Sequence, residues 1–221
     1  MKTVIFDLDG TLADTSKDLI ASANACFRGL SFGDVLDPIA DAATAFRGGR
    51  AMLNLGFSRV KPGFTEEDVS VQYPVLLEAY AENIDTHTYL YDGAIDAVKR
   101  LSANGYIVGI CTNKPEGLAE TLLQRLGIRD LFASMIGADT LPVRKPNPEP
   151  FVEAVRRAGG DPAKALLIGD TVTDRETSRA AGVPSILVTF GPTGDAVAEL
   201  SPEGLLTHYD ELDILVERLI G

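Results

Sequence analysis

Between residues 16 and 87, apolar residues recur at the three- and four-residue spacing of helices. Glycine- and proline-containing breaks separate the helical stretches, at 29–33, 48–49 and 61–63. The predicted helices cover residues 16–27, 37–46, 50–55 and 65–83. No strand-like alternation interrupts them, so we expect a block that is entirely helical.

From residue 93 onward, helical patterns alternate with short apolar runs rich in β-branched residues. The predicted helices cover residues 93–103, 115–126, 150–158, 173–181 and 211–220. The predicted strands cover residues 106–111, 134–136, 165–168, 185–188 and 205–206. This alternation is typical of a parallel sheet covered by helices on both faces.

The chain opens with another apolar run, Val4-Ile5-Phe6, which ends abruptly at Asp7. This run predicts a strand without a sheet of its own, so we expect it to join the later one. The fold class is therefore α/β: a doubly wound parallel-sheet, Rossmann-like core with an inserted all-helical cap. The predicted core comprises residues 1–15 and 88–221, and the predicted cap comprises residues 16–87.

Composition narrows the possible partners and surroundings. The 221 residues include 32 acidic and 20 basic ones, a net charge of −12, which disfavours nucleic acid and anionic membranes as partners. Cys26 and Cys111 lie in apolar segments and are expected to be reduced core residues. Without a leader-like or membrane-spanning pattern, the protein is expected to be cytoplasmic. The sequence does not predict the oligomeric state.

Two acids, Asp7 and Asp9, follow the opening strand. If the strand's alternation continued, both would project to the same side. At an effective dielectric near 20, two like charges about 4 Å apart repel by roughly 4 kcal/mol, so such a pair needs a cation or a shared proton. An ordinary hairpin turn after this strand is disfavoured, because the following residues have a helical pattern and no second strand follows to pair with the first. A calcium loop counted from Asp7 would have Leu12 and Asp18 where glycine and glutamate are required.

The strand at 165–168 is followed by Asp170 and Asp174, which adds two carboxylates at the same expected edge of the sheet. Oxygen ligands without nearby nitrogen or sulfur ligands suit Mg²⁺. Asp174 could alternatively cap the helix that follows.

Two further segments offer groups for binding a phosphate. The strand at 106–111 ends in Thr112 and Asn113 just before a predicted helix, although Thr112 would serve equally well as a cap for that helix. Lys145 lies in a segment with three prolines in five residues, which hold the chain stiff. Placed opposite the carboxylates, this lysine would neutralise charge on them and on a phosphoryl group.

Four motifs, D-L-D-G-T at 7–11, C-T-N-K at 111–114, R-K-P-N-P at 144–148 and G-D-T-V-T-D at 169–174, resemble in their order the motifs of the haloacid dehalogenase-like superfamily of phosphohydrolases. Within it the chain looks most like the phosphoglycolate phosphatases. The resemblance implies that Asp7 is the nucleophile, that Asp9 is the general acid/base, and that Thr112 and Lys145 bind phosphate. It further implies a Mg²⁺ ion held by Asp7, Asp170 and the Asp9 carbonyl, with Asp174 binding directly or through water.

The function that the resemblance implies is Mg²⁺-dependent hydrolysis of a small, phosphoglycolate-like phosphate monoester through an aspartyl-phosphate. Two alternatives remain: a sugar-phosphate mutase or phosphotransferase of the same superfamily, and a non-catalytic phospho-accepting regulatory domain. Substrate choice is expected in the cap, where Arg47 or Arg50, on either side of Gly48-Gly49, could contact a substrate carboxylate. Both arginines could equally be solvated residues at helix ends.

Overall fold

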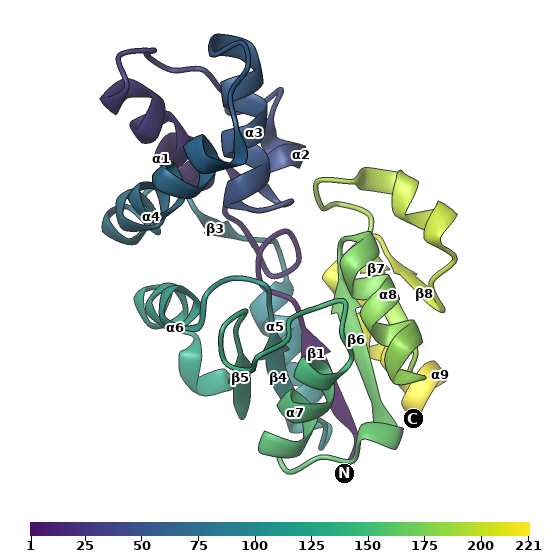
Figure 1. Cartoon of the computed structure of the whole chain (residues 1–221). Helices are drawn as coiled ribbons and strands as arrows, with labels where there is room; N and C mark the ends of the chain where they lie inside the picture. The colour runs from purple at the N-terminus through teal and green to yellow at the C-terminus, as the bar shows by residue number, and fades with distance from the viewer. The chain divides into compact units, whose positions relative to one another are not determined.

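A computed structural model describes all residues, 1–221 (Figure 1). The chain divides into two compact units. One contains Met1–Ala13 and Leu90–Gly221, and the other contains Asp14–Tyr89. These limits differ by two residues from those expected from the sequence.

The first unit is built on a six-stranded sheet in which every neighbouring pair is parallel, with the order β5-β4-β1-β6-β7-β8. Its strands are β1 (Thr3–Phe6), β4 (Ile107–Cys111), β5 (Ser134–Ile136), β6 (Ala165–Gly169), β7 (Ser185–Val188) and β8 (Gly204–Leu206). The last residue of β1, Phe6, pairs with Ile110 on one side and with Ile168 on the other. The opening strand thus joins the later sheet, as predicted, and the ends of β4, β1 and β6 meet at one edge.

Helices cover both faces of this sheet, which confirms the predicted fold class. The helices are α5 (Ala94–Ala103), α6 (Glu116–Arg125), α7 (Glu149–Arg157), α8 (Val172–Ala181) and α9 (Leu212–Ile220). Helices α7 and α8 pack together on one face, while α5 and α9 pack together on the other (Figure 1). The strands between them are almost fully buried, as continuous apolar runs in a parallel sheet require.

The second unit is helical. It contains α1 (Ser16–Gly29), α2 (Ala42–Ala45), α3 (Gly49–Val60) and α4 (Glu66–Glu82), and both α1 and α3 pack against α4. The aromatic rings of Phe27 and Phe57 meet edge to face in its core, 5.3 Å apart. Gly56 allows this packing, because a Cβ at that position would lie 2.1 Å from the Phe27 ring.

Two helices of this unit differ from those predicted. The helix expected over 37–46 is only the short α2, because the Asp37 carboxylate accepts the N–H groups of Ile39 and Ala40 and holds a turn there. The helix expected over 50–55 continues to Val60, because Phe57 extends its buried face.

The chain passes between the units in two short strands that pair with each other, β2 (Ala13–Asp14) and β3 (Tyr89–Leu90). Two-residue strands are too short to leave a periodic pattern, so the sequence did not predict them. None of the helices has the length and apolar character needed to cross a membrane.

Candidate active site

The segment after β1 forms a tight loop rather than a continuation of the strand. The backbone N–H groups of Leu12 and Ala13 donate to the Leu8 carbonyl, at 3.0 and 3.1 Å, and Gly10 has a φ of 79° that favours glycine. β1 ends at Phe6, so Asp7 and Asp9 lie beyond the strand, whose alternation was the premise for expecting them on the same side.

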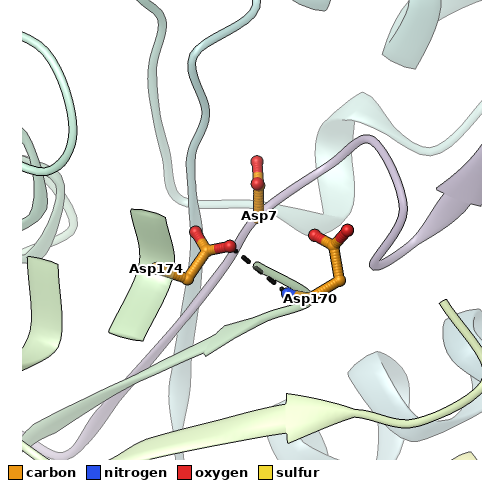
Figure 2. Close-up of side chains that lie close together, drawn as sticks. All are labelled: Asp7, Asp170 and Asp174. Carbon is orange, nitrogen blue, oxygen red and sulfur yellow. Dashed lines mark hydrogen bonds between the residues drawn. The ribbon is translucent and has the colours of Figure 1, made fainter. Parts of the chain in front are cut away.

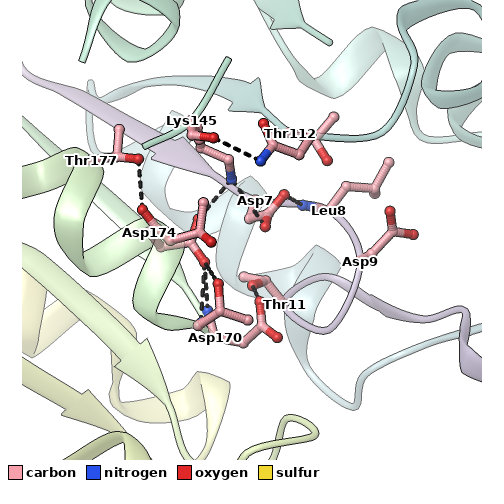
Figure 3. A network of polar contacts seen from close by, with 12 residues as sticks. Asp7, Leu8, Asp9, Thr11, Thr112, Lys145, Asp170, Asp174 and Thr177 are labelled. Carbon is pink, nitrogen blue, oxygen red and sulfur yellow. Dashed lines mark hydrogen bonds and ion pairs between the residues drawn. The ribbon is translucent and has the colours of Figure 1, made fainter. Parts of the chain in front are cut away.

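The carboxylates of Asp7, Asp170 and Asp174 do come together. One oxygen from each lies within 4.8 Å of the others, and the three side chains converge in Figure 2. They follow β1 and β6, which are neighbours in the sheet. The Asp9 carboxylate is not a member of this group and lies apart from it in Figure 3.

A buried lysine joins two of these acids. Lys145 is 2% exposed, and its Nζ lies 3.0 Å from Asp7 Oδ2 and 2.7 Å from Asp174 Oδ1. The Asn113 side chain donates to the Lys145 carbonyl at 3.0 Å. Asn113, a candidate for binding substrate, thus uses its amide nitrogen to hold the lysine segment in place.

Both oxygens of Asp174 are engaged by the protein. Oδ1 pairs with Lys145, and Oδ2 accepts the Thr171 N–H and hydroxyl, at 3.2 and 2.8 Å, in the capping box of α8. The alternative that Asp174 caps a helix is therefore correct, and it does so while facing the cluster. Gly169 permits the approach, because a Cβ there would lie 2.2 Å from Asp174 Cγ.

Asp170 is bound on one side only. Its Oδ1 accepts the Thr11 hydroxyl at 3.1 Å, whereas the buried Oδ2 has no hydrogen-bond partner. A buried carboxylate oxygen without a partner is costly, and a cation would satisfy it. Three clustered carboxylates against one ammonium, with an orphaned oxygen among them, fit a hard divalent cation such as Mg²⁺.

Burial dominates the electrostatics of the cluster. It raises the pKa of Asp7 to about 6, with Lys145 opposing the shift and Asp174 adding to it. Burial, together with the Asp174 and Asp7 charges, also raises the pKa of Asp170 well above its usual range. For Lys145, burial lowers the pKa, but the Asp174 and Asp7 carboxylates outweigh it and leave the pKa raised. Burial therefore disfavours the ionised forms of Asp7 and Asp170, and a bound cation would be needed to keep both carboxylates charged.

Thr112 is buried beside this cluster at the end of β4, and its hydroxyl accepts the Lys114 N–H at 3.2 Å. It does not cap α6: the first N–H of that helix, at Glu116, donates to Asp139 instead, at 2.7 Å. The capping alternative for Thr112 is therefore wrong.

Lys114 is a residue to which the sequence reasoning assigned no role. It is 6% exposed, and its Nζ lies 2.8 and 3.1 Å from the two oxygens of Asp9. Each of the two leading acids thus has its own buried lysine, Lys145 for Asp7 and Lys114 for Asp9. The only feature of the sequence that could have indicated this role is the position of Lys114 two residues after Thr112, in a segment expected at the same edge of the sheet.

The two candidate arginines belong to the helical unit and differ in their surroundings. Arg50 pairs with Glu66, donates to Ser70 at 3.3 Å and lies over the Tyr73 ring, 5.1 Å from its centre. Arg47 is exposed just before Gly48, whose φ is 95°. Arg50 is thus held by its own helices, whereas Arg47 stands at a sharp break.

Comparison with known proteins agrees with this geometry. The family model described as haloacid dehalogenase-like hydrolase matches residues 4–188. The phosphoglycolate phosphatase of Mesorhizobium japonicum is 37% identical over 218 residues, covering 98% of this chain and 96% of that protein. The phosphoglycolate phosphatase of Agrobacterium fabrum is 34% identical over 219 residues, covering 98% of this chain and 93% of that protein.

A crystal structure described as a predicted phosphoglycolate phosphatase from Haemophilus somnus matches with a TM-score of 0.84 and 24% identity, covering 97% of each chain. At this identity the structural likeness establishes the fold. The family match over most of the sequence and the relatives above 30% identity establish more: this chain belongs to the haloacid dehalogenase-like hydrolase family.

Proposed function

We propose that this protein is a Mg²⁺-dependent phosphatase that hydrolyses a small phosphate monoester, of the phosphoglycolate type, through an aspartyl-phosphate on Asp7. The observation that carries the proposal is the pairing of Asp7 with Lys145 next to the Asp170 and Asp174 carboxylates, together with the pairing of Asp9 with Lys114. The names of the relatives support the substrate class.

The nucleophile would be oriented by two donors. Asp7 Oδ1 accepts the Leu8 N–H at 2.7 Å, and Asp7 Oδ2 faces Lys145 at 3.0 Å. An Asp7 oxygen would attack phosphorus as the bond between phosphorus and the ester oxygen breaks. Lys145 and the Thr112 hydroxyl would bind the phosphoryl oxygens and offset the charge that two anions bring together.

Asp9 would move the protons. In the first step it would protonate the leaving alkoxide, and in the second it would deprotonate the water that attacks phosphorus of the aspartyl-phosphate. That second attack releases inorganic phosphate and restores Asp7. Lys114 would hold the Asp9 carboxylate in place for both transfers.

Mg²⁺ would be held by Asp7, Asp170 and the Asp9 carbonyl, and when bound it would neutralise the phosphate and the nucleophile. The unpartnered Oδ2 of Asp170 supports this assignment. Because both Asp174 oxygens are engaged by Lys145 and Thr171, Asp174 would act through a water molecule and through Lys145.

Inorganic phosphate release from 2-phosphoglycolate and several sugar phosphates tests the proposal, with Mg²⁺ and with a chelator, for the native chain and Asp7→Asn. We expect Mg²⁺-dependent release that Asp7→Asn abolishes. Transfer of phosphate between sugar hydroxyls without release would instead indicate the mutase, and no reaction by folded protein would indicate a non-catalytic domain.

The helical unit would form the cap and choose the substrate. We propose that Arg47 contacts the substrate carboxylate and that Arg50, already bound by Glu66 and Tyr73, does not. The test compares kcat/KM for 2-phosphoglycolate with that for 2-hydroxyethyl phosphate, which lacks the carboxylate. Arg47→Ala should lower the ratio at least tenfold, as loss of a charge-assisted hydrogen bond implies, with Arg50→Ala as the matched control. An unchanged ratio in Arg47→Ala would contradict the assignment.

A further inference from the structure

Four residues from three segments of the first unit form a wall against the Asp7–Ala13 loop: Tyr91 after β3, Phe190 and Gly191 after β7, and Tyr209 shortly before α9. Within this wall, Tyr209 is fully buried and lies 198 positions from Thr11 in the sequence. Its hydroxyl donates to the Thr11 backbone carbonyl at 2.7 Å. Burial raises the pKa of the Tyr209 phenol well above its usual range, so the group remains a donor.

Thr11 connects this hydrogen bond to the acid cluster. Its side-chain hydroxyl donates to Asp170 Oδ1 at 3.1 Å, as Figure 3 shows. The other oxygen of Asp170, Oδ2, is the buried atom without a partner. Thr11 therefore occupies one oxygen of the carboxylate and leaves the other available for a cation.

Aromatic packing fixes Tyr209 in this position. The Phe190 ring lies between Tyr209 and Tyr91, with ring centres 5.4 and 5.0 Å away. The Tyr91 N–H donates to the Leu12 carbonyl at 3.0 Å, so the next residue of the loop is held by the same wall.

The residue after Phe190 comes equally close to the loop. A Cβ at Gly191 would lie 2.8 Å from the Gly10 carbonyl oxygen and 3.1 Å from Asp170 Cβ, so a larger residue would displace the loop or the acid. The carbonyls of Gly10, Thr11 and Leu12 thus each meet this wall.

We infer that Tyr209 is a positioning residue for the proposed metal site. Its hydrogen bond to the Thr11 carbonyl fixes the position of Thr11, and the Thr11 hydroxyl in turn orients the Asp170 carboxylate. The inference rests on the proposed function, because it concerns the same cation. A phenylalanine at this position would keep the aromatic packing and leave the buried Thr11 carbonyl without its donor. The loop would then shift, and Asp170 would lose its fixed orientation.

Outer partners of metal ligands typically change metal affinity by about 10–100-fold. Because Tyr209 acts through one intervening residue, we expect Tyr209→Phe to weaken Mg²⁺ binding about tenfold. Isothermal titration calorimetry with Mg²⁺ alone measures this without any substrate. The control is Tyr106→Phe, a half-buried tyrosine that precedes β4 at the opposite edge of the sheet and lies beside Lys2. It should bind Mg²⁺ as the native chain does.

A second variant, Thr11→Val, removes the hydroxyl that contacts Asp170 and keeps the carbonyl that Tyr209 holds. It should weaken Mg²⁺ binding at least as much as Tyr209→Phe does. The variant that carries both substitutions should bind Mg²⁺ no more weakly than Thr11→Val alone, because both substitutions act on Asp170 through Thr11. This variant also tests the inference if Tyr209→Phe does not fold.

Native affinity for Mg²⁺ in folded Tyr209→Phe, even with a lower unfolding temperature in chelator, would overturn the inference and leave Tyr209 a structural residue. Native affinity in Thr11→Val would overturn it as well. If the native chain itself bound no Mg²⁺, the proposed function would fail rather than this path alone.

Discussion

Replacing the proposed nucleophile should make the metal-free protein more stable. Burial raises the pKa of Asp7 from 3.8 to about 6. A shift of about two pKa units corresponds to about 3 kcal/mol. Since the folded state binds the Asp7 proton more tightly than the unfolded state does, the free energy of unfolding falls as pH rises from about 4 through about 6. Above that range the ionised carboxylate destabilises the fold by the full amount.

Asparagine has nearly the same size and no charge, so Asp7→Asn removes this cost. In chelator we expect the variant to gain less than about 1 kcal/mol at pH 4 and about 3 kcal/mol at pH 8. For a chain of this size that gain corresponds to about 6–12 °C in Tm. Urea unfolding at both pH values measures it, with the exposed Asp130→Asn as the control.

With saturating Mg²⁺ the native chain should instead be more stable than Asp7→Asn. An ion that binds the folded state stabilises the native chain, and the variant has lost one ligand for that ion. A variant less stable than the native chain by the same amount at pH 4 and pH 8, both in chelator, would refute the reasoning. It would show that Asp7 is not held at a raised pKa in the metal-free fold.

Two further substitutions test the site and the helical core. Lys114→Met removes the ammonium that holds the Asp9 carboxylate. In steady-state kinetics kcat should fall about 10²–10⁴-fold, the range of general acid–base catalysis, with little change in KM. A change in KM alone would contradict the role of Lys114 in positioning Asp9. Gly56→Ala places a methyl group 2.1 Å from the Phe27 ring, so urea unfolding should show a loss of about 1–3 kcal/mol, and a stable variant would mean that the ring moves freely.

The sequence predicted the sheet well because buried parallel strands leave continuous apolar runs, such as Val4-Ile5-Phe6 and Leu166-Leu167-Ile168. It also placed Asp7, Asp170 and Asp174 correctly at one edge, since carboxylates that directly follow buried strands have few structural reasons to be there. The order of the strands depends on packing between distant segments, and no local pattern contains it.

Predictions failed where one side chain redirects the backbone. The Asp37 carboxylate ends a helical pattern by binding its own neighbours, and the turn at Gly10 invalidates the alternation assumed for Asp7 and Asp9. Lys114 and Tyr209 were missed for another reason: each acts on a loop about 100 or more residues away, and nothing local distinguishes them from an ordinary lysine and tyrosine.

The most direct test of the proposed mechanism is to look for the phosphorylated carboxylate itself. Protein quenched during turnover of 2-phosphoglycolate with Mg²⁺ would be reduced with borohydride, which converts an aspartyl-phosphate to homoserine, and digested for mass spectrometry. The account predicts homoserine at Asp7, and none in chelator or at Asp9. Phosphate release without modification at Asp7, or modification at another aspartate, would contradict it.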